Sequence, residues 1–125
     1  MVSSRVPPAT WVPDRADVIW IQYNPAAGAE IPDLHPMLVA STREFNQRVG
    51  IVVGFPMTHS QQHRDNPFAL PMAGPKGQAY VLAHQVKSFD WRARGAKPHR
   101  WGGGWGDLLG NALAILDDIC GPRVA

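Results

Sequence analysis

Glycine and proline interrupt this chain at short intervals, and their spacing limits what it can fold into. Each occurs 12 times in 125 residues, well above their ordinary combined share of about 12%. Both residues interrupt helices and mark turns, so the apolar runs between them suit short strands and not a helical bundle. Because 45% of the residues are hydrophobic and only 18% are charged, the chain can bury enough apolar surface to fold as one compact domain.

Between these interruptions, five segments have the composition of β-strands. They are rich in β-branched or other apolar residues and are bounded by residues that favour turns. The segments are 17–23, 37–41, 51–55, 68–72 and 79–88. Short strands at such close spacing predict a mainly β protein, a small barrel or a sandwich, whose sheet curls closed to hide its edges.

A first helical signal lies between two of these strands. Ser41 and Glu44 have the spacing of a capping box, in which the two side chains satisfy backbone N–H groups at the start of a helix. The pattern predicts a single helical turn that ends by Gly50.

A second helical signal lies near the C-terminus. Apolar residues recur at intervals of three and four from Leu109 to Cys120, which is typical of an amphipathic helix. Asp107 is placed to cap its start, and Gly121 is placed to end it. The apolar stripe must be covered, either by the strands or by a second copy of the chain.

The sequence argues against several classes of protein. Cys120 is the only cysteine, so no internal disulfide is possible and a reducing cytoplasm suits the chain. No apolar run approaches the roughly 20 residues that cross a bilayer, so we expect no membrane span. No phosphate-binding glycine loop or His-Glu-x-x-His motif occurs, so we expect no cofactor. His59 and His63 have the spacing of zinc ligands on a helix, but their neighbours indicate a loop and no metal site is predicted.

Two features remain that could serve a nucleic acid. Five of the 12 Lys and Arg residues lie between Lys87 and Arg100, opposed only by Asp90, and such a cluster attracts phosphates unless it is simply a solvated loop. Trp101 and Trp105 flank three glycines. These indoles could stack on unpaired bases, but we favour a connector that the tryptophans pin to the strands.

Five ordered segments resemble the MazF/PemK family of toxin endoribonucleases. They are Val12-Pro13-Asp14 followed by residues 17–25, Gly28-Ala29-Glu30, residues 36–41, Pro56-Met57-Thr58, and Gln85-Val-Lys-Ser-Phe-Asp-Trp-Arg-Ala-Arg-Gly95. The resemblance spans nearly the whole chain, so we expect one MazF/PemK-like domain over residues 1–125. It implies a small SH3-like β-barrel of the CcdB/PemK type with a C-terminal helix.

The resemblance also implies an activity and partners. Family members are cytoplasmic homodimers that cleave single-stranded RNA at short sequences, without a metal or cofactor. A cognate antitoxin, MazE-like, silences them by laying its acidic C-terminal tail in the RNA groove. By matching position, Glu30 and Thr58 are implied as catalytic residues. The residues implied to bind RNA are Lys87, Arg92, Arg94 and Trp20.

Each matching residue has a simpler interpretation as well. Thr58 is expected to donate its hydroxyl to the scissile phosphate, but a threonine at a strand end commonly bonds its own loop. Glu30 could contact a base edge, orient His35, or only solvate the loop.

Two positions depart from the family pattern. His35 stands directly before Pro36, where arginine is usual, and His84 stands directly before Gln85, where aspartate is usual. Metal-free cleavage uses the RNA 2′-hydroxyl as nucleophile, so the protein must supply a base, an acid and positive charge at the phosphate. Histidine can provide all three near neutral pH. We therefore expect His35 and His84 to be a catalytic acid–base pair, and replacement of His63 to be nearly silent.

Two other functions fit the same fold, because fold alone does not determine function. In the first, the two histidines mark a catalytically degenerate module that binds RNA or an antitoxin without efficient cleavage. In the second, the chain is a gyrase poison of the CcdB type. The second is disfavoured because the matching segments belong to the RNA-cleaving branch.

Overall fold

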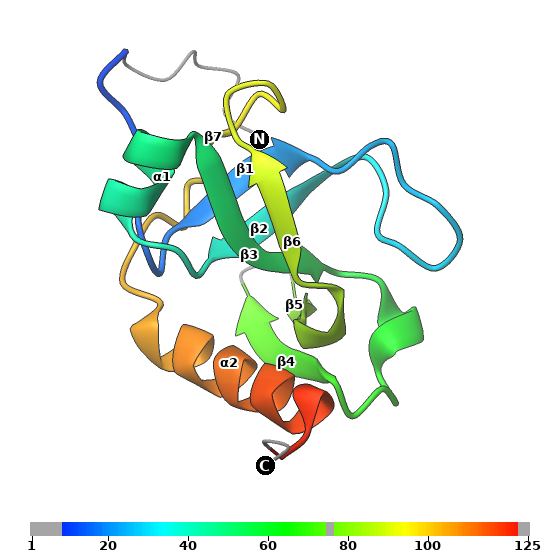
Figure 1. Cartoon of the computed structure of the whole chain (residues 1–125). Coiled ribbons are helices and arrows are strands. Elements are labelled where there is room, and N and C mark those ends of the chain that lie inside the picture. Colours follow the sequence, from blue (N-terminus) through cyan, green and yellow to red (C-terminus); the bar gives the residue numbers. More distant parts are fainter. Residues whose placement is uncertain (1–8, 75–76, 123–125) are drawn as a thin grey trace.

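The computed structural model describes residues 9–74 and 77–122, which form an antiparallel sheet with a long helix packed beside it (Figure 1). The strands are β1 Val18–Gln22, β2 Leu34–Val39, β3 Ile51–Thr58, β4 Ala69–Gly74, β5 Gly77–Leu82, β6 Lys87–Asp90 and β7 Lys97–Pro98. The helices are α1 Arg43–Val49 and α2 Gly106–Cys120, with short 3-10 turns η1 Gln61–His63 and η2 Ala83–Gln85. The predicted mainly β fold with a C-terminal helix is confirmed.

The sheet is open, and the expectation that it curls closed is wrong. Its strand order is β4-β5-β3-β2-β1-β7, with β6 paired to β3. Within the described ranges, β4 and β7 pair with no strand beyond these neighbours. β7 is only two residues long, and Pro98 has no N–H to donate, which makes this edge a poor template for further pairing. At the other end of the strand order, α2 packs against residues of β4 and runs beside that strand in Figure 1.

β3 is the central strand, and its glycine lets the neighbouring strand β2 approach closely. β2 pairs with residues Gly54 to Pro56, β6 pairs with residues Ile51 to Gly54, and β5 pairs with the last two residues of β3. A Cβ added to Gly54 would lie 2.6 Å from the carbonyl oxygen of Leu38 on β2. The close contact with β2 therefore requires glycine at this position.

The single strand expected over residues 79–88 is divided into β5, η2 and β6. β5 and β6 follow one another along β3, but the register differs by three residues between the pairs Thr58↔Tyr80 and Gly54↔Lys87. The three additional residues must leave the ladder, and they form η2. This interruption is what exposes His84. The Gly and Pro residues of segment 73–77 also predict a tight turn after β4, but residues 75 and 76 lie outside the described part of the chain.

The helices differ from expectation mainly at their first residues. α1 has seven residues, and its N-cap is Thr42, whose hydroxyl accepts from the Phe45 amide at 3.3 Å, so the expected Ser41 cap is wrong. It ends at Gly50, which has a left-handed φ of 78°. In α2, Trp105 holds the N-cap position and Asp107 lies within the first turn, where a carboxylate favours the helix dipole without capping it.

The two faces of the sheet have separate cores, and these faces locate the site. On one face, Ile19, Ile21 and Met37 belong to a buried cluster with Tyr23 and Tyr80. On the other face, Leu38 and Phe55 pack with Leu109 and Ala112 of α2, and Trp101 and Trp105 pack against that cluster. The interpretation of residues 101–106 as a pinned connector is consistent with this packing. None of the helices in the described residues is long and apolar enough to cross a membrane.

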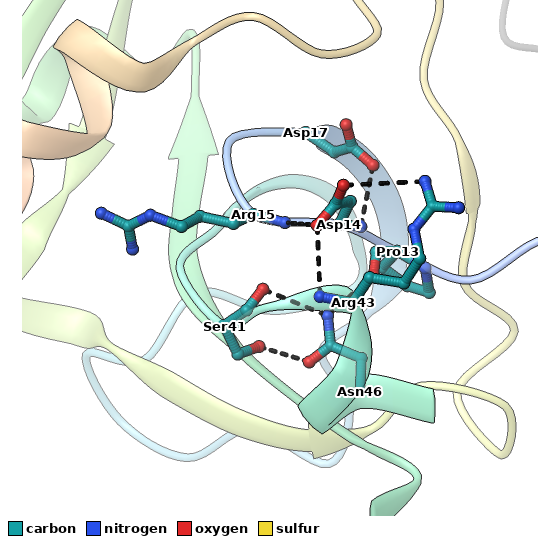
Figure 2. Close-up of polar contacts among 7 residues, drawn as sticks. All are labelled: Pro13, Asp14, Arg15, Asp17, Ser41, Arg43 and Asn46. Carbon is teal, nitrogen blue, oxygen red and sulfur yellow. Dashed lines mark hydrogen bonds and ion pairs between the residues drawn. The ribbon is translucent and has the colours of Figure 1, made fainter. Parts of the chain in front are cut away.

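Asn46 joins α1 to the segment before β1, as Figure 2 shows. Its side chain is fully buried. Its amide nitrogen donates to the carbonyl of Pro13 at 2.8 Å and to the carbonyl of Ser41 at 3.2 Å, while its amide oxygen accepts from the Ser41 hydroxyl. Close by, Asp14 pairs with Arg43 at 3.6 Å. The buried amide therefore satisfies several polar groups of otherwise unconnected segments.

We expect Asn46→Ala to lower the free energy of unfolding by about 2 kcal/mol, because it leaves buried carbonyls without donors. Urea unfolding followed by tryptophan fluorescence measures the change. Asn111→Ala, at an exposed position of α2, is the matched control and should stay within about 0.5 kcal/mol of the parent. Equal stability of both variants would contradict the structural role of Asn46.

Candidate active site

His35 and Thr58 lie on the same face of the sheet, near the end of β3. The pairing of β2 with β3 runs from Val39↔Gly54 to Met37↔Pro56. His35 and Thr58 each lie two residues beyond Met37↔Pro56, and alternation along a strand keeps them on the face of that pair. The register therefore brings these two predicted site residues toward one another.

The ring of His35 has a defined tautomer. Its Nδ1 lies 2.6 Å from the carbonyl oxygen of Pro32. Since a carbonyl can only accept, Nδ1 carries the proton and the neutral ring presents Nε2 as a base. The Tyr23 ring packs edge-on against the His35 ring, with 6.3 Å between the two ring centroids. Tyr23 itself is buried and donates to the Pro36 carbonyl at 3.1 Å, and burial raises its pKa, so it stays a neutral donor.

Thr58 is buried at the end of β3. Its hydroxyl oxygen accepts from the amide of Ser60 at 3.1 Å, which is the local loop contact that the sequence offered as the simpler interpretation. This contact uses a lone pair of the hydroxyl and leaves its proton able to donate. The residue can therefore hold its loop and still give a hydrogen bond to a phosphate.

Glu30 is held next to Lys87 by the loop between β1 and β2. One carboxylate oxygen of Glu30 accepts from the Ala27 amide at 2.9 Å, and the other lies 3.6 Å from the ammonium of Lys87. The amide of Ala27 and then the charge of Lys87 lower the pKa of Glu30. The structure thus brings together one predicted catalytic residue and one predicted RNA-binding residue as an ion pair.

Gln85 fastens this loop, and sequence reasoning assigned it no role. Its side-chain oxygen accepts from the Ile31 amide at 2.7 Å, and its nitrogen donates to the Ala29 carbonyl at 3.1 Å. The two contacts flank Glu30. They span more than 50 residues of sequence, so the only signal of Gln85 was its place in the segment that resembles the family.

His84 has different neighbours from His35. Its Nε2 lies 3.5 Å from the amide nitrogens of both Asn66 and Gln85, and its ring lies beside that of His63. In the described part of the chain, no hydrogen bond or ring contact joins His84 to His35. The expected pair is therefore not in direct contact, and His63 is the histidine that the structure places next to His84.

The expected RNA-binding arginines occupy two separate places. Arg92 stacks on Trp91 at 4.0 Å just after β6, at the end of β3 opposite Thr58. Arg94 donates to the carbonyls of Gln22 at 3.1 Å and Asn24 at 2.8 Å. These bonds hold the base of the Glu30 loop, so Arg94 already has a structural role.

Trp20 lies on the other face of the sheet from His35. Its neighbours Ile19 and Ile21 point into the core on the His35 face, so alternation directs Trp20 the opposite way. Its ring stacks on His99 at a centroid distance of 4.7 Å. The sheet therefore separates this residue from the other predicted site residues.

Among residues 9–74 and 77–122, no group of three or more His, Cys, Asp or Glu side chains is arranged to hold a metal ion. The described site consists of imidazoles, a hydroxyl, an ion pair and backbone carbonyls. Such groups can exchange protons with a substrate and bind its phosphate.

Comparison with known proteins agrees with this geometry. Residues 14–102 match the family described as PemK-like, MazF-like toxin of type II toxin-antitoxin system. The endoribonuclease toxin MazF of Escherichia coli (strain K12) is 37% identical over 86 residues, which are 69% of this chain and 76% of that protein. The endoribonuclease MazF of Escherichia coli O157:H7 has the same identity and coverage.

Solved structures show the same fold. The crystal structure of MazF from Deinococcus radiodurans has a TM-score of 0.79 and 28% identity, covering 90% of this chain and 99% of that one. A MazE–MazF complex from the same organism matches with a TM-score of 0.71 and 27% identity, over 90% and 100% of the two chains. The match over residues 14–102 and the relative at 37% identity establish that the chain belongs to the PemK-like, MazF-like family of type II toxin–antitoxin toxins.

Proposed function

We propose that this chain is the toxin endoribonuclease of a type II toxin–antitoxin system. It cleaves single-stranded RNA at short sequences, and the 2′-hydroxyl of the RNA is the nucleophile. The observation that carries the proposal is the orientation of His35, whose Nδ1 donates to the Pro32 carbonyl on the face that also bears Thr58. With Nδ1 engaged in this way, Nε2 is the ring atom that can act as a general base. The endoribonuclease names of the two curated relatives support the reaction class.

In this mechanism each residue has one task. His35 takes the proton of the 2′-hydroxyl, whose oxygen attacks the adjacent phosphorus. Thr58 donates its hydroxyl to the phosphate. His84 gives a proton to the departing 5′-oxygen, which leaves a 2′,3′-cyclic phosphate and a 5′-hydroxyl. Glu30 is included among the catalytic residues because we propose that the loop that carries it lies beside the bound phosphate.

The remaining proposed contacts bind the RNA chain. Lys87, Arg92 and Arg94 neutralise backbone phosphates, a task for which Lys and Arg are suited. Arg92 and Trp20 lie away from His35, so we propose that they contact RNA that continues along β3 and past the sheet edge. No cofactor or metal takes part in this proposal.

The proposal extends to partners and location. The MazE–MazF complexes of Deinococcus radiodurans support a MazE-like antitoxin, whose acidic tail would compete with RNA for the cationic groups. We further propose that residues 1–125 act as one domain, that the toxin is a homodimer, and that it works in the cytoplasm, where its RNA is. Ile119 of α2, 39% exposed, extends an apolar stripe that a second copy can cover.

The reaction type has a direct test. Purified protein should cleave single-stranded RNA in the presence of EDTA, and a single 2′-deoxy substitution at the mapped cleavage site should abolish cleavage there, because the nucleophile is missing. End-group analysis should find a cyclic phosphate. Binding of RNA without cleavage would favour the degenerate module, whereas cleavage of the deoxy-substituted site would require water or a metal hydroxide as nucleophile.

A further inference from the structure

His84, which belongs to the proposed site, lies side by side with a second histidine from a separate loop. His63 is the last residue of η1 and His84 is the middle residue of η2. Their ring centroids are 6.2 Å apart, with 52° between the ring planes. His84 is exposed and His63 is partly buried. Both rings therefore face a surface that a ligand can reach.

The loop that carries His63 is fixed to the site at both ends. At its start, the amide of Ser60 donates to the hydroxyl oxygen of Thr58 at 3.1 Å. At its end, the amide nitrogen of Asn66 lies 3.5 Å from Nε2 of His84. His63 is thus held between the residue proposed to donate to the scissile phosphate and the residue proposed to protonate the leaving oxygen.

The groups around the two rings are donors and not acids. The amide nitrogens of Asn66 and Gln85 lie 3.5 Å from Nε2 of His84, and that of Gln62 lies 3.4 Å from Nε2 of His63. An amide N–H donates, so in a neutral ring Nε2 accepts and Nδ1 carries the proton. No carboxylate contacts either ring in the described part of the chain. Such a surface suits an anion.

The two rings also influence one another electrostatically. Burial and then the charge of His84 lower the pKa of His63. Neighbouring segments carry five other charged residues, which are Arg64, Asp65, Lys87, Asp117 and Asp118. In the described part of the chain, none of their side chains makes a hydrogen bond or ion pair with either ring. Because two nearby imidazolium ions repel, the pair carries one positive charge more readily than two.

We propose that His63 is a further RNA-contacting residue, paired with His84 so that the two imidazoles together bind one phosphate of the substrate. This inference rests on the proposed ribonuclease function and names a contact of the same site. One ring supplies the positive charge and the other a neutral N–H donor, while the phosphate offers several acceptor oxygens. The inference replaces the expectation that substitution of His63 is silent, which followed from treating it as an isolated loop residue.

The first experiment compares His63→Gln with a control from the same loop. His63→Gln removes the imidazole but keeps a polar side chain, and it should lower kcat/KM for RNA and the affinity for a 2′-deoxy-substituted, uncleavable RNA by about ten-fold each. His59→Gln is the control, because the His59 ring lies against Trp101 at 6.5 Å, and it should match the parent. His63→Lys, which places a positive charge at this position, should bind RNA more tightly than His63→Gln.

The second experiment tests the pairing without RNA. In the whole chain, NMR titration of the His63 ring should show a higher pKa in His84→Gln than in the parent, because the repelling positive charge of His84 is gone. An unchanged titration overturns the pairing. If the parent cleaves RNA while His63→Gln matches it in kcat/KM and in affinity, the contact is overturned and the proposed function stands. If the parent neither cleaves nor binds RNA, the proposed function fails and the contact fails with it.

Discussion

His35→Ala is expected to lower the rate constant of RNA cleavage by roughly 10² to 10⁴-fold, the usual range for the loss of a general acid or base. The hydrogen bond from Nδ1 to the Pro32 carbonyl, at 2.6 Å, fixes the ring so that Nε2 is the atom available to the 2′-hydroxyl. His84→Ala should fall in the same range, since it removes the proposed proton donor. Single-turnover cleavage at saturating enzyme measures the chemical step separately from RNA binding.

Two variants at the same strand make this test specific. Leu34→Ala changes the neighbouring residue, which is 47% exposed and points to the opposite face, so it should cleave at the parental rate. His35→Arg restores the residue usual in the family, and recovered activity would indicate that histidine has taken over the role of arginine. If His35→Ala and His84→Ala both cleave like the parent, the two histidines are structural. Thr58 with Arg92 or Arg94 then becomes the better candidate for the catalytic groups.

The strands could be predicted from local sequence because β-branched segments between prolines and glycines have few alternatives. Residues 17–23 contain all of β1, and residues 51–55 contain most of β3. The division of residues 79–88 could not be predicted in this way. It arises because β5 and β6 pair with β3 in registers that differ by three residues, and a register depends on the partner strand.

The residue types of the proposed site come from the sequence, whereas their arrangement comes from the fold. The resemblance placed Glu30 in one segment and both Gln85 and Lys87 in another, and only the fold shows that Gln85 holds the loop of Glu30. The orientation of Trp20 was available from sequence, since it alternates with Ile19 and Ile21 in β1. Only the pairing of Ile21 with His35 shows that His35 shares the face of these isoleucines, opposite to Trp20.

The second large effect concerns stability and comes from His99, which lies outside the proposed site. His99 is 8% exposed, and its Nδ1 accepts from the Trp101 amide at 3.0 Å. Its ring lies 4.7 Å from that of Trp20 and 5.0 Å from that of Trp101. Burial, with smaller contributions from the charges of Arg100 and His59, lowers the pKa of His99 to about 4.

A lowered pKa on a base makes the folded state less stable in acid. Above the ordinary histidine value of 6.5, His99 is neutral in both states and pH has no effect through it. Between 6.5 and about 4, the unfolded chain binds a proton that the folded chain does not, so stability falls as the pH falls. The total loss through this residue is about 3 kcal/mol, and below that window it changes no further.

We expect urea unfolding, monitored by tryptophan fluorescence, to show this loss of stability between about pH 7.5 and about pH 4. His99→Asn is the matched variant, because an asparagine oxygen can accept from the Trp101 amide and does not titrate. Other groups, such as Glu30 with its lowered pKa, titrate in both proteins, so the difference between their stability curves isolates His99. Parallel curves would mean that His99 takes up its proton in the folded state, and its packing between Trp20 and Trp101 would then have to open without unfolding the sheet.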